Sequence, residues 1–223
     1  MALPARVDPY LEEGEVKPRL RGVSHALAFV ASLVGCFYLA LAPVEGARYV
    51  SSLVFGVTLV LLFGTSATYH CPVWSPAISE RLRRCDHAAI YVVIAGSFTP
   101  LAALDAAGWG PLLLWVMWPA ALTGAGLALV GYSGPRHLRS VLYVLLGAIA
   151  VPVALGLPAV IGPARVGWLF LEGFLYTLGA VIYVRRWPNP HPPIFGFHEI
   201  FHLLVVASAA IHYAVLISVL YAR

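Results

Sequence analysis

Seven apolar runs, each long enough to cross a bilayer as a helix, limit what this chain can fold into more than any other feature. A transmembrane helix needs about 20 apolar residues, with roughly 17 to 25 tolerated. The runs cover residues 22–42, 49–70, 87–104, 111–131, 140–157, 166–184 and 196–220. At these lengths only helices satisfy every backbone polar group in lipid, because barrel strands would read as shorter segments of alternating polarity. We therefore predict an all-α, polytopic membrane protein, a bundle of seven transmembrane helices.

The composition also indicates that lipid is the solvent of this chain. Of its 223 residues, 61% are apolar and only 11% are charged, which is more apolar surface than a soluble domain of this size encloses. The connectors are short, so we predict one transmembrane domain over residues 22–223, preceded by a cytoplasmic segment over residues 1–21. That segment mixes acidic and basic residues, and we expect no cleavable signal peptide. Pro100, Pro119 and Pro152 lie inside predicted spans and can mark kinks there.

The Lys and Arg residues fall mostly on one side of the predicted membrane. Eleven of the 14 belong to the N-terminal segment or to the second, fourth and sixth connectors, and the others are Arg48, Arg165 and Arg223. Because Lys and Arg concentrate in cytoplasmic loops, the N-terminus is predicted in the cytoplasm and the C-terminus outside. Orientation in the membrane accounts for the net charge of +4, so nucleic acid is not expected as a partner.

Two histidines open the last predicted span with the spacing of metal ligands. His198 and His202 are four residues apart, which places both imidazoles on one face of a helix. His70 ends a span that runs toward the same face of the membrane. Three histidines and one open position are the arrangement of a catalytic zinc site, so we predict zinc at His70, His198 and His202. The alternative is a set of interfacial histidines with ordinary hydrogen bonds; a metalloprotease with Glu199 as base lacks the usual third ligand downstream.

Two polar residues beside these histidines are candidates for catalysis. Ser66 lies one helical turn before His70, in reach of a bound water or a substrate carbonyl, and Asp86 lies at the same predicted depth, where it can orient or deprotonate that water. Each has an ordinary alternative. The Ser66 hydroxyl can bond to its own helix backbone, and Asp86 can pair with Arg83 or Arg84.

His25 and Glu172 also fall inside predicted spans. His25 begins the first span at the depth of the other histidines, where it either lines the site or is a hydrogen-bonded core histidine. Glu172 is an isolated carboxylate in the sixth span, toward the outer face and remote from the proposed metal, where it either snorkels toward water or is locally bonded.

Several segments together resemble one known family. The segments are SHALAF (24–29), SATYH (66–70), SFTP (97–100) in the span that Asp86 opens, LYTLGAVIY (175–183) and FGFHEIFH (195–202). Their order and their positions in the spans resemble the bacterial hemolysin III branch of the progestin and adipoQ receptor family, whose relatives include adiponectin receptors and, more broadly, alkaline ceramidases.

The resemblance implies a seven-helix bundle with zinc held by three histidines, here His70, His198 and His202. It also matches Ser66 and Asp86 to the serine and aspartate that accompany the metal in the family. The bacterial branch implies a bacterial inner membrane. Glu172 departs from the family pattern.

Three functions follow as hypotheses, and the first is a zinc-dependent hydrolase that cleaves an amide or ester bond of a membrane lipid. The second is a non-enzymatic membrane sensor or receptor in which the zinc is structural, as a coordinating Asp86 would indicate, because structural sites are usually closed by four protein ligands. The third, membrane lysis or pore formation, follows from the family's name. In each case a membrane lipid and the bilayer are the expected partners, and no oligomeric state is predicted.

Overall fold

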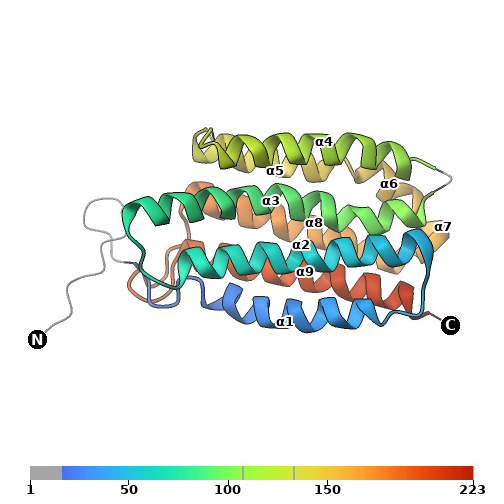
Figure 1. The fold of residues 1–223 in the computed structure, drawn as a ribbon, viewed down its shortest axis with the longest axis horizontal. Coiled ribbons are helices and arrows are strands. Elements are labelled where there is room, and N and C mark those ends of the chain that lie inside the picture. Colours follow the sequence, from blue (N-terminus) through green and yellow to red (C-terminus); the bar gives the residue numbers. More distant parts are fainter. Residues whose placement is uncertain (1–16, 107, 133, 223) are drawn as a thin grey trace, which may run out of the picture.

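The computed structural model describes residues 17–106, 108–132 and 134–222, which form nine helices and no strand (Figure 1). Seven helical segments are long and apolar enough to cross a membrane, with α5 and α6 together forming the fifth. The predicted all-α, seven-span fold is confirmed, and residues 1–16 of the predicted N-terminal segment lie outside the described residues. The helices are α1 (Val23–Ala40), α2 (Gly46–His70), α3 (Pro76–Leu104), α4 (Gly110–Leu129), α5 (Arg136–Ala148), α6 (Val151–Gly156), α7 (Pro158–Ile161), α8 (Pro163–Arg185) and α9 (Phe197–Leu220).

The helices form a closed ring with one helix outside it. α1 contacts α2 and α9, α2 contacts α3, α3 contacts α5, α5 contacts α8, and α8 contacts α9. α4 packs on the outside of this ring against α3. The start of α1 and the end of α9 lie at opposite ends of the bundle, as an odd number of spans requires (Figure 1). We call the end at which α1 begins the N-terminal end of the bundle.

The fifth span is broken where the sequence places a proline. α5 ends at Ala148 and α6 begins at Val151, although the prediction was one run over residues 140–157. Pro152 has no N–H to donate to the carbonyl of Ala148, so the helical hydrogen-bond ladder is interrupted there. Pro100 and Pro119, by contrast, lie within α3 and α4, which continue past them.

α3 is longer than its apolar run. It begins at Pro76 rather than at residue 87, and Pro suits the first turn of a helix because its missing N–H would be unpaired there anyway. In the added turns Glu80 accepts hydrogen bonds from both Arg83 and Arg84. A hydropathy pattern detects only the part of a helix that faces lipid or core, so it misses such polar turns.

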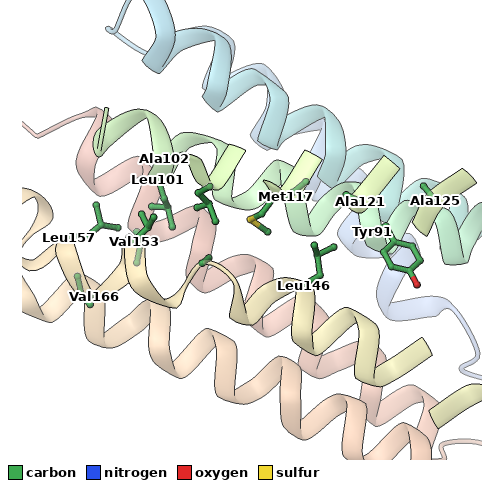
Figure 2. Close-up of a cluster of buried hydrophobic side chains, with 14 of the residues drawn as sticks. Tyr91, Leu101, Ala102, Met117, Ala121, Ala125, Leu146, Val153, Leu157 and Val166 are labelled. Carbon is green, nitrogen blue, oxygen red and sulfur yellow. The ribbon is translucent and has the colours of Figure 1, made fainter. Parts of the chain in front are cut away.

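Small residues allow α4 to pack closely on the ring. Ala121, Ala125 and Ala128 are buried on one face of α4, and the Tyr91 ring of α3 lies against this cluster (Figure 2). Interfaces between membrane helices are rich in small residues because lipid provides little driving force and close van der Waals packing must replace it. The opposite face of α4 exposes Trp115 at 79% and Leu122 at 57%, as expected for a surface that faces lipid.

Gly96→Ala tests the close packing of α3 on α2. A Cβ at Gly96 would lie 2.2 Å from Thr58 Oγ1, a hydroxyl that is itself held by a bond to the Phe55 carbonyl. Overpacking of this kind costs about 1–3 kcal/mol, so the unfolding midpoint in detergent should fall. Gly126→Ala is the matched control, since nothing lies within 4 Å of its Cβ position and alanine favours helix. Equal midpoints for the two variants would contradict the close contact.

Candidate metal centre

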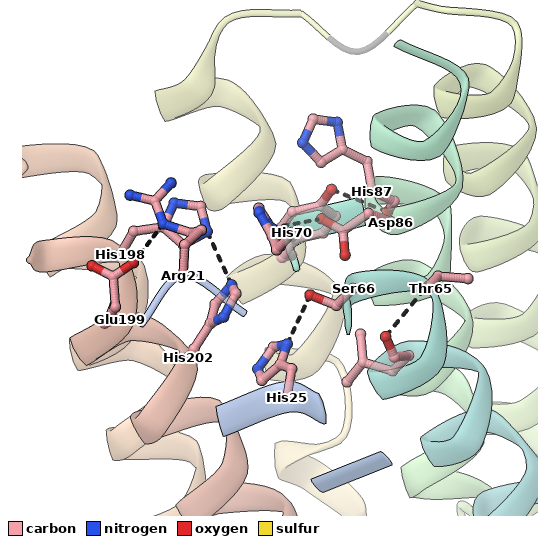
Figure 3. A network of polar contacts seen from close by, with 12 residues as sticks. Arg21, His25, Thr65, Ser66, His70, Asp86, His87, His198, Glu199 and His202 are labelled. Atoms are coloured by element: carbon pink, nitrogen blue, oxygen red, sulfur yellow. Dashed lines mark hydrogen bonds and ion pairs between the residues drawn. The ribbon is translucent and has the colours of Figure 1, made fainter. Parts of the chain in front are cut away.

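The three predicted histidines meet at the N-terminal end of the bundle. His70 is the last residue of α2, while His198 and His202 lie on successive turns at the start of α9 (Figure 3). One ligand nitrogen from each ring lies within 4.8 Å of the other two, and Nε2 of His198 is 2.9 Å from Nε2 of His202. His70 is 5% exposed and His202 is 2% exposed. This cluster, which joins the second helix to the last, could hold a metal ion.

The spacing of the nitrogens fits a zinc ion. Zinc–nitrogen bonds of about 2.0–2.1 Å put the nitrogens of a tetrahedral site about 3.4 Å apart. The 2.9 Å between His198 and His202 lies below that value and the 4.8 Å limit for the whole cluster lies above it. The tetrahedral spacing thus falls within the range that the cluster spans, and imidazole is a preferred ligand of zinc.

Asp86 lies beside the histidine cluster and not within it. Its Oδ2 is 3.7 Å from Nε2 of His70, and among the described residues the group of mutually close ligand atoms contains the three histidines alone. The ordinary alternative for Asp86 was a pair with Arg83 or Arg84, but both arginines bind Glu80 instead. The Asp86 carboxylate therefore faces His70 rather than an arginine, and it lines the cavity next to the histidines.

Ser66 bonds to His25 rather than to its own helix. Its Oγ lies 2.8 Å from Nδ1 of His25, so the simple backbone-bonded interpretation is wrong for this serine. The His25 ring in turn stacks on the His202 ring, with centroids 3.8 Å apart and planes 6° from parallel. The sequence left open whether His25 lines the site or is a hydrogen-bonded core histidine. In the structure it does both, because it bonds to Ser66 and contacts the histidine cluster (Figure 3).

An ion pair that the sequence did not predict fixes the start of α9. Arg21 donates through Nε to Oε1 of Glu199, whose other oxygen accepts the backbone N–H of Gly196 at 2.7 Å. Glu199 is 3% exposed, and it caps the helix end from which His198 and His202 project. Nearby, the backbone N–H groups of residues 19 and 20 donate to the carbonyls of residues 193 and 194. The segment before α1 is therefore held against the segment before α9.

Glu199→Ala should lower the free energy of unfolding by about 3 kcal/mol, because it leaves the Arg21 guanidinium buried without its partner and uncaps α9. The measurement is a denaturant or thermal titration in detergent. A double-mutant cycle with Arg21→Ala is the control: the two losses should be clearly less than additive, since each removes the same pair. Strict additivity would mean that Arg21 and Glu199 do not interact in solution.

A cavity of about 880 Å³ opens next to the cluster. It is lined from α1, α2, α3, α5, α6, α8 and α9, and none of its lining residues comes from α4. All the predicted site residues reach it, and away from them its wall is mostly apolar. The site residues in the lining are Ser66, His70, Asp86, His198 and His202, joined by His25.

The sixth-span carboxylate, Glu172, has a partner. Its two oxygens lie 3.1 and 2.9 Å from Nδ1 of His212 on α9, so it is a bonded carboxylate and not a snorkelling one. The sequence did carry a signal for this pair and for Arg21 with Glu199, because ionisable side chains inside or next to spans are costly unless they are paired. It did not indicate which residues would pair.

The fold and the site together define a polytopic α-helical membrane protein with a buried three-histidine cluster at one end of the bundle. The chain belongs to the Haemolysin-III related family, whose model matches residues 14–213. The resemblance to the hemolysin III branch of the progestin and adipoQ receptor family is thereby confirmed.

Curated relatives come from bacteria and animals. The chain is 29% identical to the hemolysin-3 homolog of Bacillus subtilis (strain 168), over 87% of this chain and 90% of that protein. It is 25% identical to the human monocyte to macrophage differentiation factor, over 89% of this chain and 82% of that protein. It is 27% identical to the Drosophila melanogaster adiponectin receptor protein over 85% of this chain, a match that spans 48% of the receptor.

Proposed function

We propose that this protein is a zinc-dependent hydrolase that cleaves an amide or ester bond of a membrane lipid. The observation that carries the proposal is that three histidines, and no fourth ligand among the described residues, converge on the wall of a large and mostly apolar cavity. Three protein ligands with one open position characterise catalytic zinc sites, whereas structural sites are usually closed by four.

In the proposed reaction, the three histidines, Asp86 and Ser66 have different roles. When bound by His70, His198 and His202, zinc supplies a Lewis acid for the carbonyl and lowers the pKa of a bound water to about 7. Asp86, next to His70, accepts the proton of the attacking water. Ser66, oriented by His25, donates its hydroxyl to the water or to the oxyanion that develops on the substrate.

The cavity suits a lipid rather than a water-soluble substrate. Beyond the polar residues at its N-terminal end, its wall includes Phe98, Leu169, Phe170 and Phe174. An acyl chain in contact with these side chains places the head-group linkage near the histidines. The lipid enters laterally from the bilayer or from the cytoplasmic side.

Metal content and fatty acid release from a mixture of lipid amides and esters test this function. Purified wild-type protein should contain close to one zinc ion per chain and should release fatty acid in repeated turnovers. Zinc without turnover would favour the membrane sensor with a structural metal. Permeabilised liposomes at low protein occupancy would favour the lytic function. Folded protein without bound metal would overturn the site altogether.

The proposed location is a bacterial inner membrane, with the N-terminal end of the bundle in the cytoplasm. The Bacillus relatives and the clustering of Lys and Arg at that end support this placement. Cys71, an exposed free thiol directly after His70, provides the test. A membrane-impermeant maleimide should label it in inverted membrane vesicles and not in intact cells; the reverse pattern would invert the topology.

A further inference from the structure

Glu172 is a buried carboxylate far from the histidine cluster. It lies on α8 and is 5% exposed. Its partner His212 follows His202 by ten residues on α9, which is about 15 Å along the helix axis. Ionisable residues inside a membrane span are costly and usually functional, and the proposed hydrolysis makes no use of this one.

His212 holds the carboxylate in a fixed orientation. Both oxygens of Glu172 lie within hydrogen-bond distance of the same nitrogen, so we assign Nδ1 as the donor. The His212 ring is 1% exposed and packs against the rings of Phe55, at 4.8 Å between centroids, and Phe98, at 6.4 Å. The imidazole cannot turn away, and the acceptor group stays in place.

Most of the hydrogen-bonding capacity of this carboxylate is unused. An ionised carboxylate has about four acceptor sites, and His212 supplies one N–H. Among the described residues, His212 is the side chain that donates to it, and the nearby hydroxyl of Ser208 bonds to the backbone carbonyl of Glu172. A buried carboxylate with so few donors is expensive in an apolar setting. Glu172 lines the 880 Å³ cavity and His212 does not, so a ligand in the cavity can reach the carboxylate and donate a further hydrogen bond.

We propose that Glu172 binds a hydroxyl group on the hydrocarbon chain of the lipid that occupies the cavity. A hydroxyl donates the missing hydrogen bond and adds no charge, whereas an ammonium group would have to carry its charge to the middle of the bilayer. The position of the hydroxyl rests on the proposed function, which places the reacting carbonyl at the histidines. A separation of about 15 Å along α9 corresponds to about 12 carbons of an extended chain. The ligand class is therefore a long acyl chain hydroxylated near its middle.

Binding of three free fatty acids to wild-type protein in nanodiscs tests the proposal without any variant. The probes are stearic acid, 12-hydroxystearic acid and 2-hydroxystearic acid. We expect 12-hydroxystearic acid to bind about tenfold more tightly than stearic acid, as one hydrogen bond to a charged group implies. The 2-hydroxy isomer should bind like stearic acid, because its hydroxyl lies at the histidine end. Equal affinity for stearic and 12-hydroxystearic acid, or an equal gain with the 2-hydroxy isomer, would overturn the site.

A double variant assigns the preference to this pair. Glu172→Leu/His212→Leu removes both partners. We choose the double variant because a buried pair can often be replaced by apolar side chains without loss of stability, whereas removal of one partner leaves the other buried without a hydrogen bond. This variant should bind stearic acid as the wild type does and lose the preference for the 12-hydroxy acid. Thr177→Val is the matched control, since Thr177 also lines the cavity from α8 but its hydroxyl bonds to the Gly173 carbonyl. A preference that survives in the double variant would overturn the assignment to Glu172.

The two proposals can fail separately. Protein that prefers the 12-hydroxy acid but hydrolyses no lipid would retain the hydroxyl site and overturn the hydrolase. Protein that releases fatty acid in repeated turnovers but shows no preference among the three probes would retain the hydrolase and overturn the hydroxyl site.

Discussion

His202→Ala is expected to reduce bound zinc from about one ion per chain to background and to lower lipid hydrolysis by about 10³-fold or more. His202 is the most deeply buried of the three ligands that sequence and structure place together, and its Nε2 lies 2.9 Å from that of His198. Two histidines on α2 and α9 cannot hold zinc as three do, so loss of metal and loss of activity should occur together. Elemental analysis of purified protein and a fatty acid release assay measure the two effects.

His137→Ala is the matched control for this result. His137 is an exposed histidine in the first turn of α5, at the same end of the bundle as the cluster and outside it. Its replacement should change neither metal content nor turnover. If His202→Ala retained one zinc per chain and stayed folded, the metal would bind elsewhere, and the three-histidine site would be refuted.

Asp86→Asn is expected to lower kcat by about 10²–10⁴-fold while zinc stays bound, the range typical for loss of a general base. The amide keeps the shape of the carboxylate but cannot accept a proton from water. Because Asp86 lies 3.7 Å from Nε2 of His70 and outside the group of mutually close ligand atoms, its replacement should leave the three metal ligands in place. Turnover and metal content measured on the same preparation separate the two roles.

Asp105→Asn serves as control at the other end of α3, where that carboxylate accepts the backbone N–H of Gly110. It should leave kcat unchanged. Loss of zinc in Asp86→Asn would identify Asp86 as a fourth ligand and favour a closed, structural site. Full activity with zinc retained would mean that another group takes the proton.

The positions of the spans could be predicted from sequence because lipid imposes one simple requirement on every span. Apolar length alone located all seven, and only features that apolar length does not encode were wrong. The polar first turns of α3, from Pro76, carry no hydropathy signal. The break between Ala148 and Val151 depends on whether a proline kinks or interrupts a helix, and Pro100 shows that the residue type does not decide this.

The histidine cluster was predictable for a similar reason. The spacing of His198 and His202 is local, and topology alone places His70 at the same end of the bundle. The pairs of Arg21 with Glu199 and of Glu172 with His212 join residues 178 and 40 positions apart. Which side chains meet across such distances depends on how far each helix is rotated about its axis, and the identities of the residues do not fix that rotation.

The division of the ligands between α2 and α9 has a consequence for how the protein is made. A ribosome delivers the chain from its N-terminus, so His70 enters the membrane long before His198 and His202 exist. Arg21 is likewise synthesised long before its partner Glu199, which lies 178 residues later in the sequence. A nascent chain with six spans inserted therefore has the cavity walls that α1 to α8 contribute but cannot assemble the proposed centre. Under the proposed function, an unfinished copy, or one truncated before α9, would therefore be unable to hydrolyse lipids of the membrane in which it is being built.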